Sequence, residues 1–183
     1  GRDITWDQYC KWNLPIRHVV EDILNEYEGD RECADFQNFT VYAKRLFFAN
    51  GIHHHYSEDK FFPECPKEYF QSLMEAVGDG KQATELLEVI YSPDIYPQRR
   101  STSKTGDIVE LSAVNFYDGV TREEVDKYYN SMMDPNDKTP ISYGLNTKVV
   151  KEDGKVVEKP WKVGGIYGPA LEKICADLEK AAA

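Results

Sequence analysis

The sequence lacks the motifs and apolar runs that mark several common classes of protein. No two of its cysteines form a Cys-x-x-Cys pair, which excludes a thioredoxin-type redox motif and a zinc knuckle. No apolar run approaches the ~20 residues of a membrane span. Acidic residues number 32 against 22 basic ones, for a net charge of −10, whereas nucleic-acid partners require clustered lysine and arginine. We therefore expect neither a nucleic acid nor a membrane as a partner.

Histidine is also scarce, and its spacing matches no familiar zinc motif. Besides His18, the chain has only the consecutive His53, His54 and His55, and none belongs to a His-Glu-x-x-His pattern. If this segment is extended, His53 and His55 share one face and His54 points the other way. A His-x-His pair still needs a third ligand. We favour a polar, hydrogen-bonded segment beside a cleft over a metal site.

The overall composition suits a globular protein. A length of 183 residues predicts a single domain over 1–183. Aromatic residues make up 13% of the chain, a proportion that fits either a packed core or a peptide-binding cleft. The four cysteines are far apart in sequence, and we expect buried free thiols rather than two disulfides.

Apolar periodicity predicts helices in the first half of the chain. They cover residues 15–28, 33–49, 66–77 and 81–91. The second of these helices should end at Asn50-Gly51, because both residue types adopt positive φ angles readily. It then delivers the chain into an aromatic, histidine-rich stretch, residues 47–63. A mobile loop should follow over 92–106.

The second half predicts strands as well as helices. Residues 108–116 are rich in β-formers and predict a strand. A capping box at Thr121-Arg122-Glu123-Glu124 starts a helix that runs to Met133. It should bury Val125, Tyr128, Tyr129 and Met132.

A hairpin and a final helix complete the prediction. Residues 146–164 form the hairpin around a type I′ turn at Asp153-Gly154. That register places Val150 opposite Val157 and pairs the charges of Glu152 and Lys155. Pro169 opens the last helix, which should bury its apolar stripe of Leu171, Ile174, Cys175 and Leu178. The fold class is therefore α+β: helices packed around a small, partly antiparallel β-sheet or an incomplete β-barrel.

Several uncommon strings occur along the whole chain. They are GRDI, DQY and KWNLPIR near the start, then YAKRLFFANGIHHHYSEDKF, VNFYDGVTREEVDKYYNSM, PISYGLNTKVVKEDGK and WKVGGIYGPALEKI. In content and order they resemble the bacterial branch of the dipeptidyl peptidase III family of zinc exopeptidases. That family carries a His-Glu-x-x-x-His helix and a later Glu-Glu-x-x-Ala-Asp segment, and this sequence contains neither. The resemblance therefore implies the N-terminal, lower-lobe part of such an enzyme, without its zinc-binding catalytic lobe.

The resemblance also implies a function. The intact protein would use zinc to remove dipeptides from the N-terminus of oligopeptides, whereas this chain would bind no cofactor and be inactive alone. It would contact the missing catalytic lobe and supply one wall of the substrate cleft, with His53, His55 and Tyr56 as substrate-binding residues.

The alternative is a free-standing, non-catalytic peptide-binding or assembly domain. The two hypotheses differ in one respect that is easily checked: only the exopeptidase hypothesis requires the gene to continue into a His-Glu-x-x-x-His segment. We expect a cytoplasmic location, with a periplasmic or exported one as the alternative.

Overall fold

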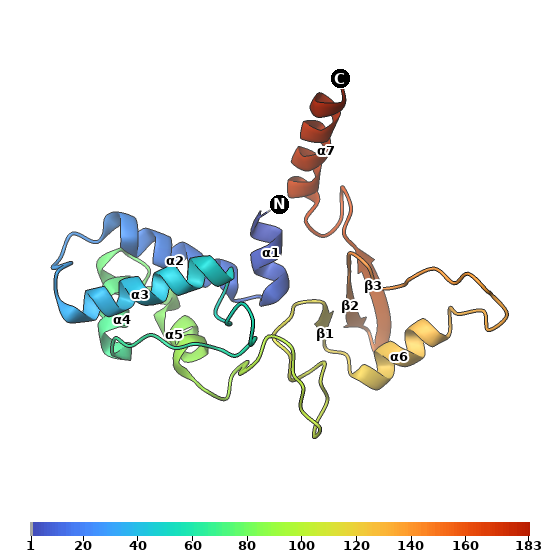
Figure 1. Cartoon of the computed structure of the whole chain (residues 1–183), viewed down its shortest axis with the longest axis horizontal. Coiled ribbons are helices and arrows are strands. Elements are labelled where there is room, and N and C mark those ends of the chain that lie inside the picture. Colours follow the sequence, from blue (N-terminus) through green and yellow to red (C-terminus); the bar gives the residue numbers. More distant parts are fainter. Residues whose placement is uncertain (1) are drawn as a thin grey trace.

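The computed structural model describes residues 2–183, and over this range the fold is α+β, as predicted (Figure 1). These residues form seven α-helices, a short 3₁₀ helix and a three-stranded sheet that does not close into a barrel. The elements fall into two groups that lie side by side in Figure 1. We call residues 2–100 the helical body and residues 107–183 the sheet unit. The single-domain organisation stays a prediction.

The helical body contains α1 (Arg2–Tyr9), α2 (Asn13–Glu26), α3 (Ala34–Ala49), α4 (Lys67–Ala76) and α5 (Ala83–Tyr91), with the 3₁₀ helix Gly80–Gln82 before α5. The predicted end of α3 is confirmed. Asn50 adopts a left-handed conformation with φ of 55°, and its N–H bonds to the carbonyl of Leu46. Helix α2 begins at Asn13, so Pro15 lies inside its first turn, where a missing N–H breaks no helical hydrogen bond.

Aromatic and aliphatic side chains fill the core of the helical body. Trp6, Phe39, Leu46 and Phe70 are fully buried. The rings of Phe39 and Phe70 meet edge to face with centroids 5.1 Å apart. Each such side chain contributes roughly 1.5–3 kcal/mol by leaving water. This core fixes α3, and α3 in turn positions the histidine stretch.

The sheet unit contains β1 (Tyr117–Asp118), α6 (Arg122–Asn130), β2 (Thr147–Glu152), β3 (Lys155–Pro160) and α7 (Gly168–Ala182). The strand order is β1-β2-β3, with β1 parallel and β3 antiparallel to β2.

The hairpin prediction is largely confirmed. Asp153 and Gly154 both have positive φ, and Val150 pairs with Val157. Glu152 lies opposite Lys155 as predicted, but the predicted ion pair between them is wrong, because the Glu152 carboxylate contacts Lys159 on the same face of the hairpin.

The predicted strand over 108–116 is wrong. Residues 108–111 form a turn in which the amide of Leu111 donates to the carbonyl of Asp107 at 3.0 Å. The Asp107 carboxylate also accepts from the amide of Val109 at 2.8 Å. A local acceptor of this kind satisfies the backbone without a partner strand. It overrides the β-propensity of the segment, and strand pairing starts only at Tyr117.

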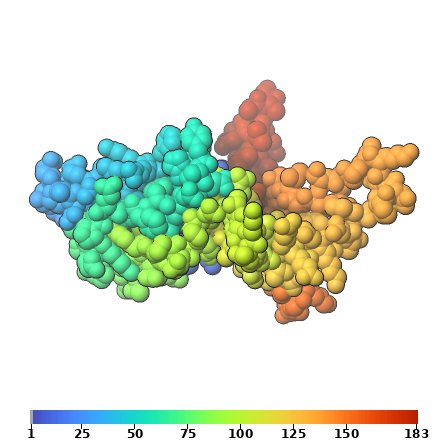
Figure 2. All heavy atoms as spheres, turned by 60° about the horizontal axis from the view of Figure 1, so that its bottom comes forward, coloured from blue at the N-terminus to red at the C-terminus, as the bar shows by residue number. Residues whose placement is uncertain are grey.

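Two predictions of burial are also wrong. The capping box at Thr121 is present, but α6 ends at Asn130 and Met132 is 38% exposed. In α7 the side chain of Leu178 is 64% exposed and Cys175 is exposed. Figure 1 shows why: α7 leaves the sheet unit and points away from the other elements. Figure 2 shows α7 and the loop after α6 projecting from the surface.

Two further findings concern the chain as a whole. Among residues 2–183, no helix is both long and apolar enough to cross a membrane. All four cysteines lie in this range and are free. Cys10 and Cys65 are buried as expected, while Cys33 is half-buried and Cys175 exposed.

Candidate functional site

The histidine stretch starts from a point that Asn13 holds in place. Asn13 is completely buried; its Nδ2 donates to the carbonyl of Trp6 at 3.0 Å, and its Oδ1 accepts from the amide of Ile52 at 3.2 Å. Gly51 packs against this side chain, and a Cβ at residue 51 would lie 2.3 Å from Asn13 Nδ2. Gly51 also has φ of 148°, so glycine is required for both space and conformation.

Residues 52–61 form a closed loop rather than an extended segment. His53 and Lys60 pair in antiparallel fashion, and the amide of Phe61 donates to the carbonyl of Ile52 at 3.1 Å. At the tip, His54 Nδ1 accepts from the amides of Tyr56 and Ser57 at 3.3 and 3.2 Å. The imidazole thus closes a tight turn. The prediction that His53 and His55 share one face is therefore wrong.

His53 points into the protein and is only 2% exposed. Its Nε2 lies 2.9 Å from the carbonyl oxygen of Tyr96. A carbonyl only accepts, so Nε2 carries the proton. Burial lowers the pKa of His53 to about 4, which keeps the ring neutral at pH 7. His53 is thus part of a hydrogen-bonded segment, as expected, but its ring bonds to the backbone of its own chain.

Lys60 is a second buried polar side chain in the loop. Its Nζ donates to the carbonyl of Val89 at 2.9 Å and contacts the carbonyls of Ser92 and Ile95. Val89 lies in the last turn of α5, and Ser92 and Ile95 follow the end of that helix, where a cation is favoured by the helix dipole. Burial lowers the pKa of Lys60 to about 8, so the amine is still mostly charged at neutral pH.

Glu58 ties the loop to the segment after α5. It adopts φ of 65° and accepts from Arg99 at 2.7 Å and from Arg100 Nε at 2.8 Å. Hydrogen bonds from the guanidinium groups lower the pKa of Glu58 to about 2, and the bond from Arg100 has the larger effect. Together with His53 and Lys60, this carboxylate makes the loop rigid.

The outer side of the loop borders a groove of about 320 Å³. It is lined by Arg45, Phe48, Ala49, His54, His55 and Phe61. Phe48 is 73% exposed and Tyr56 is 82% exposed. The His55 ring meets both of them edge-on, with centroids 5.8 Å from Phe48 and 4.8 Å from Tyr56. We call Phe48, His55 and Tyr56 the aromatic rim; contiguous exposed apolar surface of this kind typically marks an interaction site.

The structure brings together two of the three residues predicted for the site. His55 and Tyr56 lie on the rim, whereas His53 faces the core. Sequence reasoning missed Phe48 and His54. A signal for Phe48 was present, because it follows Arg45 by three residues on the polar face of α3. His54 was missed because the turn that redirects it depends on its own ring nitrogen.

These side chains do not fit a zinc ion. Among residues 2–183, no three histidine, cysteine, aspartate or glutamate side chains lie close enough together to hold a metal. One ring nitrogen of His53 is bonded to Tyr96, and one of His54 is bonded to backbone amides.

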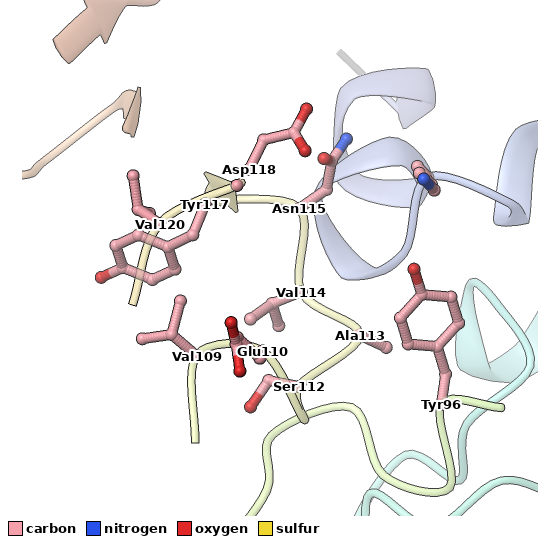
Figure 3. Close-up of a pocket in the computed structure, with 12 residues that line it drawn as sticks. Tyr96, Val109, Glu110, Ser112, Ala113, Val114, Asn115, Tyr117, Asp118 and Val120 are labelled. Carbon is pink, nitrogen blue, oxygen red and sulfur yellow. The ribbon is translucent and has the colours of Figure 1, made fainter. Parts of the chain in front are cut away.

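A second pocket of about 290 Å³ lies where the two groups of elements meet (Figure 3). Lys11 and Tyr96 of the helical body form one wall, and residues 109–120 form the other. Asn115 and Asp118 lie at its edge in Figure 3. We call it the junction pocket. The sequence did not predict it, because irregular segments form most of its lining.

No protein-family model and no curated protein matches this chain. The resemblance to the dipeptidyl peptidase III family therefore depends on the sequence strings alone and stays a prediction. Compared with the junction pocket, the groove has the more apolar lining and an exposed aromatic ring, Phe48, which are features of peptide-binding surfaces.

Proposed function

We propose that this chain supplies one wall of the substrate cleft of a zinc-dependent exopeptidase, which removes dipeptides from the N-terminus of oligopeptides. The observation that best supports the proposal is the exposed aromatic rim, because it lies on the very string that resembles the family. The zinc ligands and the catalytic base would come from other residues. The role of this chain is then to bind the peptide rather than to cleave it.

The groove suits the side chains of an extended peptide. Phe48 and Phe61 offer apolar surface, and His54, His55 and Arg45 offer polar groups beside it. The rigid loop beneath holds these groups in place before binding, which reduces the entropy lost on association. The net charge of −10 attracts basic peptides and repels acidic ones at long range, which favours neutral or basic peptides over acidic ones.

Peptide binding by the isolated chain tests the proposal. Calorimetry with a short unblocked oligopeptide should detect binding that Phe48→Ala weakens by about 1–2 kcal/mol, the scale of one aromatic contact. Ile141→Ala is the matched control, since Ile141 is 71% exposed and lies in the sheet unit. Equal losses in the two variants, or no binding by the wild type, would contradict the role of the groove.

Catalysis is tested separately with a dipeptidyl arylamide and added zinc. Residues 1–183 should give no turnover, because they lack the zinc ligands of the family. Zinc-dependent turnover that persists through repeated purification would show that the chain is an enzyme by itself.

One observation favours the alternative of a non-catalytic assembly domain. Helix α7 presents Leu178 and Cys175 to solvent, as an assembly helix would. Sedimentation of the wild type and of Leu178→Lys measures this directly. A concentration-dependent dimer that the substitution abolishes would favour the assembly domain over the cleft wall.

A further inference from the structure

The two groups of elements have separate hydrophobic cores. The buried cluster of the helical body ends at Ile90, and that of the sheet unit consists of Val120, Val125 and Val149 with a few partly buried neighbours. Neither cluster includes side chains of the other group. A small sheet with so little buried apolar surface is marginally stable on its own. The position of the sheet unit must therefore depend on contacts across the junction.

Besides backbone hydrogen bonds from Ala113 and Val114 to Gln98 and Arg99, the contacts converge on two residues, Asp7 of α1 and Asn115. Asn115 Nδ2 donates to Asp7 Oδ2 at 3.1 Å, and its backbone N–H donates to the carbonyl of Gln8 at 2.8 Å. The hydroxyl of Tyr167 donates to the same Asp7 oxygen. Lys148 Nζ donates to Asn115 Oδ1 at 2.7 Å. The segment before β1, strand β2 and the residue before α7 are thus joined to one carboxylate.

The charges of Asp7 and Lys148 determine how the side-chain amide of Asn115 is oriented. The amide of Asn115 lies between an anion and a cation, so its NH₂ must face Asp7 and its oxygen must face Lys148. Tyr167 adopts φ of 59°, a left-handed conformation that is costly for a residue other than glycine. Its hydroxyl bond to Asp7 helps to hold that conformation.

We propose that Asp7, Asn115, Lys148 and Tyr167 form a latch that holds the sheet unit against α1 and that opens while both groups of elements stay folded. The pivot is the linking segment, residues 101–106. Beside it, the carbonyl of Arg99 accepts from the amide of Val114 at 3.1 Å. Because the junction pocket has one wall on each side, opening the latch changes that pocket and leaves the histidine groove intact. The latch is independent of the proposed peptidase function.

Reciprocal substitution in the full chain tests the latch. Asn115→Asp preserves size but places a second carboxylate against Asp7. Adding Asp7→Asn places an amide donor at residue 7 opposite the new carboxylate at residue 115. That carboxylate still accepts from Lys148. In Asn115→Asp, hydrogen exchange at the amide of residue 115, which donates to Gln8 across the junction, should accelerate by roughly tenfold relative to its intrinsic rate. Exchange in α3 and in the β2–β3 ladder should stay unchanged, and the amide of residue 115 should return most of the way in the double variant.

A pair of tyrosine variants supplies the matched control. Tyr167→Phe removes one hydrogen bond across the junction. Tyr129→Phe removes the bond to Glu158, 3.0 Å long, which lies wholly within the sheet unit. Only Tyr167→Phe should increase the radius of gyration in solution scattering, and it remains informative if Asn115→Asp does not fold.

Three results would overturn the latch. One is faster exchange in both groups of elements alike, which indicates global unfolding. Another is unchanged exchange in both Asn115→Asp and Tyr167→Phe. The third is faster exchange in the sheet unit without any change in scattering or any rescue by the reciprocal pair, which indicates local fraying.

Discussion

At the scale of single residues, His53 shows how a buried imidazole can serve the fold rather than a ligand. It is 2% exposed and bonded to Tyr96 through Nε2. In the structure described here, Nδ1 is buried without a hydrogen-bond partner. A proton added to this ring would place a charge in a nearly dry site. The ring should therefore resist protonation as long as the protein is folded.

The stability of the protein should consequently fall as pH drops from about 6.5 towards 4. The folded pKa of His53 is lowered from 6.5 to about 4, so the unfolded chain binds the extra proton in this window. The loss should be on the order of 3 kcal/mol. Glu58 loses its contribution lower, between its usual value of 4.5 and about 2. Urea unfolding at pH 7.5, 5.5 and 4.5 measures the effect, and His53→Gln should remove most of it. An unchanged pH dependence in the variant would contradict the assignment.

Tyr56 should matter for binding but not for folding. Because 82% of its surface is exposed, Tyr56→Ala should change the free energy of unfolding by less than about 0.5 kcal/mol. Peptide affinity should fall by about 1–2 kcal/mol. Tyr42→Ala is the contrast: Tyr42 is 1% exposed, and its removal should cost about 3–5 kcal/mol of stability. Thermal unfolding and calorimetry on both variants compare the two effects. A large loss of stability in Tyr56→Ala would show that Tyr56 packs in the core and does not belong to the aromatic rim.

At the scale of elements, local physics explains which predictions succeeded. The helices of the helical body and the β2–β3 hairpin follow from apolar periodicity and from the positive φ angles of Asp153 and Gly154. The strand over 108–116 failed because Asp107 captures the backbone amides. The burial of α7 failed because sequence periodicity shows an apolar stripe but not whether anything packs against it.

Lys60 connects the loop of residues 52–61 to the end of α5 and the segment after it, and its loss should loosen both. Lys60→Met keeps the length and apolar stem of the side chain but removes the donor from three carbonyls, including that of Val89. We expect a loss of about 2–3 kcal/mol of stability, because buried acceptors are left unpaired. Hydrogen exchange should rise first at residues 92–98. Protection of 92–98 that stays at the wild-type level would contradict this role.

At the scale of the whole molecule, the sequence predicted the fold class and one residue, His55, of the six that line the groove. It did not predict the junction, because the residues that meet there are far apart in the chain: Asp7 contacts Asn115 and Tyr167 across separations of 108 and 160 residues. Periodicity and turn signals report on neighbours within a few residues, so they carry no information about such contacts. The predicted site was limited by the same fact, since Phe48 and His55 meet only after α3 and the loop of residues 52–61 have packed.

The most direct test of the central claim is a map of where an oligopeptide touches this chain. Amide chemical shifts of labelled protein, titrated with a short unblocked peptide, should move at residues 45–61. The peptide concentration at half-saturation should rise by about 5–30-fold in Tyr56→Ala and stay unchanged in Ile141→Ala. Shifts confined to the junction pocket around Lys11 and Tyr96, or none at saturating peptide, would contradict a peptide-binding wall at the histidine stretch.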